Sequence, residues 1–100
     1  MSYSWRYIWK LAKVNRVLNK ASDAVMAGDL RSARRLLEQG FQLIRTMKLP
    51  ATALINAITG TGLMGVRLDE LGAKDLASIC HKEAKLLQAR FDAGDFNPDP

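Results

Sequence analysis

The chain has 100 residues, with 15 Lys or Arg against 10 Asp or Glu, and therefore a formal charge of +5. That length fits one domain, because domains cluster near ~100–150 residues, and it argues against two lobes around a catalytic cleft. The single cysteine excludes an internal disulfide, and an apolar fraction of 48% excludes a disordered chain.

The first predicted element is an amphipathic helix between Ser4 and Gly28. Its apolar residues recur at steps of three and four and so share one stripe: Tyr7, Leu11, Val14, Leu18, Ala21 and Val25. Ser4 is a suitable N-cap, and Gly28 suits the left-handed residue that ends many helices. Charge enters at Arg6, so this segment lacks the run of ~7–15 apolar residues that a secretory signal requires. We therefore expect a cytoplasmic protein.

A second helix is predicted from Asp29, which can cap it, to the residue before Pro50. Its apolar stripe consists of Leu30, Ala33, Leu37, Gly40, Ile44 and Met47. Proline cannot continue a helix, because it lacks the amide hydrogen, but it suits the first turn of the next one.

The third predicted helix, from about Pro50 to Glu70, is rich in small and uncharged residues. A ridge of small side chains recurs there every four residues: Ala53, Ala57, Thr61 and Gly65. Such a ridge predicts a tight contact with another helix. The uncharged stretch 49–66 reaches the length of a membrane span, but it contains a proline, an asparagine and three glycines. We therefore expect a buried helix in a bundle and no membrane contact.

A fourth helix is predicted from about Lys74 to Ala93. Its apolar stripe consists of Leu76, Cys80, Ala84, Leu87 and Phe91. Together the four segments predict an all-α fold: a small bundle of about four helices arranged as two helical hairpins. We expect residues 1–93 to form one helical domain, and residues 94–100 to form a flexible C-terminal tail.

Gly60, Gly62 and Gly65 have the spacing Gly-x-Gly-x-x-Gly, which resembles the dinucleotide-binding turn of Rossmann-type dehydrogenases. That resemblance implies a strand before the turn and a nucleotide at a helix N-terminus. The surrounding sequence does not fit, because 49 residues of helical character precede Pro50 and 35 residues follow Gly65. The small-residue ridge accounts for the same glycines, so we expect no nucleotide and no other cofactor.

Cys80 and His81 are adjacent, which raises the question of a thiol nucleophile or a metal site. Neighbours on a helix diverge by ~100°, so the two side chains do not face each other, and Cys80 falls on the apolar stripe. One cysteine and one histidine supply half of a tetrahedral zinc site. We therefore expect a buried thiol, no metal site, no catalytic residues and no enzymatic activity.

Positive charge is concentrated in the N-terminal half, where residues 1–50 carry +7 while residues 51–100 carry −2. The first helix has a basic band beside its apolar stripe, and three arginines cluster at the start of the second helix, where the helix dipole disfavours cations. Two tryptophans lie among the first basic residues. The candidate partner-binding residues are Trp5, Arg6, Trp9, Lys10, Lys13, Arg16, Lys20, Arg31, Arg34 and Arg35.

These features support two hypotheses. The first is a non-enzymatic protein-interaction module, a small helical subunit, adaptor or inhibitor that occupies the surface of an acidic protein or of a second copy of itself. Exposed tryptophan, tyrosine and arginine are frequent hot spots of such interfaces, and the charge difference between the halves suits a homo-oligomer. The second is a nucleic-acid-binding helical protein, or a small subunit of a nucleoprotein complex, whose cations contact phosphates.

Overall fold

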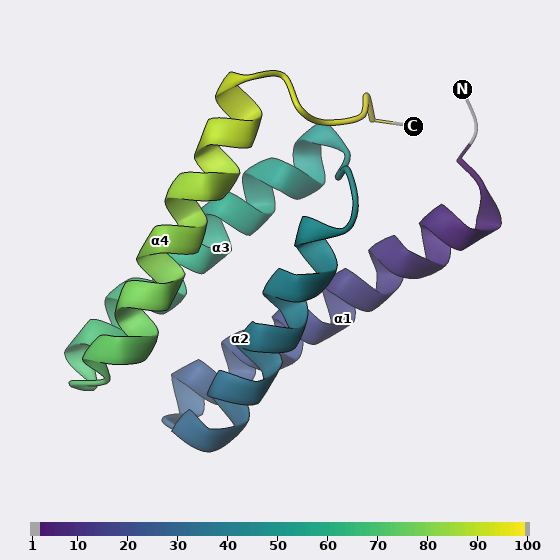
Figure 1. Ribbon diagram of the computed structural model, residues 1–100. Helices are drawn as coiled ribbons and strands as arrows, with labels where there is room; N and C mark the ends of the chain where they lie inside the picture. The colour runs from purple at the N-terminus through teal and green to yellow at the C-terminus, as the bar shows by residue number, and fades with distance from the viewer. Residues whose placement is uncertain (1–2, 100) are drawn as a thin grey trace.

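The computed structural model describes residues 3–99, which form four helices and no strand (Figure 1). They are α1 (Trp5–Ala27), α2 (Leu30–Arg45), α3 (Ala51–Glu70) and α4 (Lys74–Asp92). Helix α1 packs along α2, and α3 packs along α4, while α1 and α3 make a smaller contact between the pairs. The predicted all-α bundle of two helical hairpins is confirmed.

The predicted caps of the first hairpin are also confirmed. The Ser4 hydroxyl accepts a hydrogen bond from the Tyr7 amide at 3.2 Å. Gly28 ends α1 in the left-handed region, with φ of 75°, and the Asp29 carboxylate accepts from the Ser32 amide at 3.3 Å. The hydrogen bonds from Ser32 also hold the pKa of Asp29 below its ordinary value.

Each hairpin contains one glycine that allows its two helices to approach closely. A Cβ atom on Gly40 of α2 would lie 2.9 Å from the Leu18 side chain of α1, and one on Gly65 of α3 would lie 2.6 Å from the His81 ring of α4. Gly65 thus supplies the tight contact that the ridge predicted. Ala57 and Thr61 of the same ridge are buried.

The glycine spacing of residues 60–65 is part of a helix and not of a phosphate-binding turn. All three glycines lie inside α3, and its first residue follows Pro50, whose backbone is extended. Because a dinucleotide-binding turn needs its glycines between a strand and a helix N-terminus, the resemblance does not extend to the structure.

Helix α2 ends at Arg45, so Met47, the last residue of its predicted stripe, lies in the loop before Pro50. Proline disfavours helix in the residues just before it, and a side chain of α4 binds carbonyl groups at this helix end. The Arg90 guanidinium of α4 donates to the carbonyl oxygens of Ile44 at 3.1 Å and Met47 at 2.7 Å. These bonds satisfy carbonyl groups that a helix end leaves without partners. The Thr46 hydroxyl donates to the Leu43 carbonyl at 2.8 Å and so satisfies another carbonyl group in the last turn of α2.

The core lies between the hairpins, and its largest fully buried side chains are Phe41, Leu37, Ile44, Leu49, Leu54, Leu68 and Leu87. Glu83 of α4 is buried as well, with 3% of its surface exposed. It accepts two hydrogen bonds of 3.2 Å from Arg45 of α2. This bidentate ion pair joins the two hairpins and fixes how they meet.

The segment expected to be a flexible tail makes specific contacts with the start of α3. The Asn97 amide donates to the Leu49 carbonyl at 2.8 Å, and the Asn97 carbonyl accepts from the Ala51 amide at 2.9 Å. Phe96 stacks on Phe91 of α4 with ring centroids 5.3 Å apart. The flexibility of residues 94–100 stays a prediction, and Pro100 lies outside the described residues.

Within residues 3–99, no helix combines the length and the apolar character that crossing a membrane requires.

Candidate functional site

The exposed side of α1 carries both tryptophans and the predicted basic residues. Trp5 and Trp9 are 76% and 67% exposed, and neither contributes to the core. We define the α1 face as the seven exposed side chains Trp5, Arg6, Trp9, Lys10, Lys13, Arg16 and Lys20. Five of them follow one another at steps of four, four, three and four, from Trp5 to Lys20, and therefore lie on one stripe of the helix. Arg6 and Lys10 border that stripe.

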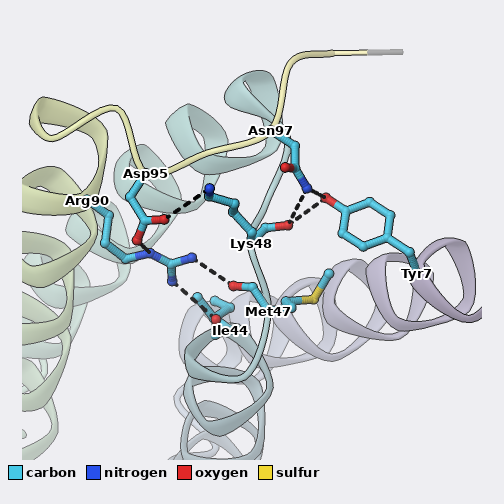
Figure 2. A network of polar contacts seen from close by, with 7 residues as sticks. All are labelled: Tyr7, Ile44, Met47, Lys48, Arg90, Asp95 and Asn97. Atoms are coloured by element: carbon cyan, nitrogen blue, oxygen red, sulfur yellow. Dashed lines mark hydrogen bonds and ion pairs between the residues drawn. The ribbon is translucent and has the colours of Figure 1, made fainter. Parts of the chain in front are cut away.

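The N-terminal turns of α1 are held in place from their opposite side by Tyr7. The Tyr7 hydroxyl donates to the Lys48 carbonyl at 2.6 Å and accepts from the Asn97 side-chain amide at 3.1 Å (Figure 2). The Lys48 side chain pairs with Asp95, which also pairs with Arg90. This network ties α1 to the α2–α3 loop and to the C-terminal segment, and it fixes the direction in which the tryptophans project.

The cations of the α1 face have no acidic partner within the described part of the chain. The ion pairs of residues 3–99 involve other residues, such as Arg45 with Glu83 and Lys48 with Asp95. Four cations (Arg6, Lys10, Lys13 and Arg16) surround Trp9 in a shallow depression of the surface. A cluster of like charges without compensation attracts an anionic surface and speeds its association.

The three arginines of α2 form a separate group. Arg31 and Arg34 line a depression between the first turn of α2 and the α3–α4 turn, together with Lys74. Arg34 also pairs with Glu38 at 3.8 Å. This group lies far from Trp5, because α2 begins where α1 ends and Trp5 is at the other end of α1. At 1.5 Å per residue, the length of α1 between them is about 30 Å. The ten predicted residues therefore form two groups, of which one holds the tryptophans.

The Cys80 thiol is buried, as predicted, and burial raises its pKa to about 11. At neutral pH it is therefore protonated and a poor nucleophile. His81 lies half-buried against Gly65, and its Nε2 atom is 2.8 Å from the Asp69 carboxylate. The contact with His81 lowers the pKa of Asp69. No group of three metal-binding side chains occurs among residues 3–99.

A groove between α1 and α3 is lined by uncharged side chains only, among them Asn15, Asn19, Asn56 and Thr61, and has a volume of about 160 Å³. It contains no titratable group and therefore offers no acid–base chemistry of its own.

Sequence reasoning located the α1 face because exposed cations and aromatics follow helical periodicity. It did not find Tyr7, Asn97 and Asp95 as the groups that position this face. The periodicity placed Tyr7 on the core stripe, but its hydrogen-bond partners lie 41 and 90 residues away.

Comparison of the chain with protein-family models, with curated proteins and with solved structures finds no match.

Proposed function

We propose that this protein is a non-enzymatic interaction module that binds an acidic protein surface through the α1 face. The observation that carries the proposal is the exposure of Trp5 and Trp9 on the same helix face as cations that lack a partner in residues 3–99. Tryptophan and arginine are the residues most enriched among interface hot spots. Basic residues around such a centre steer an acidic partner toward it and set its orientation.

The arrangement of the aromatic side chains favours a protein over a nucleic acid. Trp5 and Trp9 lie one helical turn apart at one end of α1, with the half-exposed Ile8 beside them, and form a single apolar centre. Proteins that bind single strands instead distribute aromatic side chains along a basic groove, so that successive bases can stack. The run of unpaired cations along α1 supports phosphate contacts as the second candidate.

The test uses charge-reversal variants that change the net charge equally. Lys13→Glu with Arg16→Glu alters the α1 face, while Lys82→Glu with Lys85→Glu alters exposed positions of α4. Each pair shifts the charge by four units. Binding is followed by tryptophan fluorescence with two probes, an amphipathic helical peptide rich in Glu and Leu and a 20-nucleotide single-stranded DNA.

We expect the α1 pair to weaken peptide binding at least about tenfold, which corresponds to ~1.4 kcal/mol, and the α4 pair to leave it nearly unchanged. Trp9→Ala should weaken binding with little salt dependence, because it removes apolar area and no charge. Equal losses from both pairs would show a nonspecific charge effect and contradict the proposal. Tight DNA binding with a steep salt dependence and no peptide binding would establish the nucleic-acid function instead.

A further inference from the structure

The outer face of α3 exposes apolar side chains along its length. Ile55, Leu63 and Val66 are 46%, 59% and 51% exposed. The sequence contains no charged residue from position 49 to position 66, so no charged side chain of α3 interrupts this face. The exposure of these side chains shows that α1 and α4 leave this side of α3 open, and a line of exposed apolar side chains marks a candidate contact surface.

Gly62 lies on the same face and has no explanation within a single copy of the chain. A Cβ atom at Gly62 or at Gly60 would meet nothing within 4 Å, whereas one at Gly40 or Gly65 would clash with a neighbouring helix. Of the two open glycines, Gly62 is the one in line with Ile55 and Val66. Glycine inside a helix lowers its stability by ~1 kcal/mol relative to alanine. Close approach by another backbone on the open side would account for the missing side chain.

The spacing of the residues on this face is that of a helix-pairing surface, which we call the α3 seam: Ile55, Thr59, Gly62 and Val66. Steps of four, three and four place these residues in one line, as in a coiled-coil contact. When a second α3 runs antiparallel with Thr59 opposite Gly62, Ile55 lies opposite Val66. Small residues then meet at the centre and β-branched apolar residues meet on both sides, so the α3 seam is complementary to itself.

We propose that a second copy of this chain covers the α3 seam and forms a two-fold symmetric dimer with antiparallel α3 helices. A charged partner surface is disfavoured, because its charges would be buried without compensation, while the neutral face of another copy matches this one. The antiparallel arrangement also places the helix dipoles in opposite directions. The inference concerns α3 and does not depend on the proposed function of the α1 face.

One pair of helices buries less than the ~800 Å² per partner of a standard interface, so we expect a dimer with a dissociation constant in the micromolar range.

Sedimentation velocity of the full chain between about 5 and 500 µM tests the proposal. We expect the mean mass to rise from monomer to dimer over this range. Val66→Lys should raise the dissociation constant at least about tenfold. Leu86→Lys is the matched control, since Leu86 of α4 is 53% exposed and Val66 is 51% exposed, and it should leave the dissociation constant within about twofold. A wild-type chain that stays monomeric at 500 µM overturns the proposal.

The register has its own test. Ile55→Lys and Val66→Glu should each weaken the dimer. In either variant, each copy places a charge opposite an apolar residue of the other copy. The double variant should recover most of the lost affinity, because the antiparallel register brings each new lysine opposite a glutamate of the other copy. A double variant weaker than both single variants would overturn this register. None of these substitutions alters the α1 face, so failure of this proposal is distinguishable from failure of the proposed function.

Discussion

Gly60 and Gly65 lie five residues apart in α3, but a methyl group would meet different surroundings at the two positions. At Gly60 it would meet nothing within 4 Å, whereas at Gly65 it would press on the His81 ring. That ring cannot easily move away, because its Nε2 atom is held 2.8 Å from the Asp69 carboxylate. The same residue type is therefore required at one position and replaceable at the other.

We predict that Gly65→Ala destabilises the fold by about 1–3 kcal/mol, because the added atom overpacks the α3–α4 contact. Gly60→Ala should instead raise the free energy of unfolding by about 0.5–1 kcal/mol, because alanine restricts the unfolded chain and favours the helix. Equilibrium unfolding in urea at low protein concentration measures both. Equal stability of the two variants would show that the His81 ring yields to the methyl group.

At the scale of helices, the ends that depend on local chemistry were predictable and those that depend on distant residues were not. Ser4, Gly28 and Asp29 act through groups no more than a few residues away, so the sequence identified all three caps. The carbonyl groups at the end of α2 bind Arg90, which lies 43 and 46 residues away from them. Sequence periodicity does not reveal such a partner, and the predicted stripe extends to Met47, two residues beyond the end of α2.

We predict that Arg90→Met lowers the free energy of unfolding by about 2–3 kcal/mol. The substitution keeps most of the apolar length of the side chain, but it removes the charge-assisted hydrogen bonds to the carbonyls of Ile44 and Met47 and the ion pair with Asp95. Arg35→Met, at an exposed position of α2, is the control and should change stability by less than about 0.5 kcal/mol. Similar losses in both variants would mean that Arg90 does not hold the end of α2.

At the scale of the whole molecule, the sequence indicated two hairpins but not how they meet. Periodicity marks the apolar stripe of each helix, and short turns bring consecutive helices together. The docking of one hairpin on the other depends on single contacts such as Arg45 with Glu83, and nothing in the local pattern distinguishes Glu83 from an exposed acidic residue. The α1 face was predictable because exposure requires no partner, whereas the network that orients it joins three separate parts of the chain.

We predict that the amides of Ala51 and Asn97 exchange with solvent at least about tenfold more slowly than the amide of Asp99. Both donate hydrogen bonds between the C-terminal segment and the start of α3, while none is found for the Asp99 amide within the described residues. Hydrogen exchange followed by NMR resolves the three signals. Free exchange at Asn97 with slow exchange in α4 would confirm the flexible tail that the sequence suggested.

The contact between Tyr3 and Pro98 has a consequence for the entropy of the unfolded protein. The Tyr3 hydroxyl donates to the Pro98 carbonyl, so the folded state already brings together residues that are 95 positions apart. A flexible covalent cross-link between positions 3 and 98 would span a contact that the folded state already makes, but it would remove the freedom of these positions to separate in the unfolded chain. For a closed loop of that size, the lost chain entropy corresponds to about 4–5 kcal/mol at 25 °C in the entropic model of cross-linking. A chain cross-linked at these two positions would therefore resist unfolding more strongly than the chain without the cross-link.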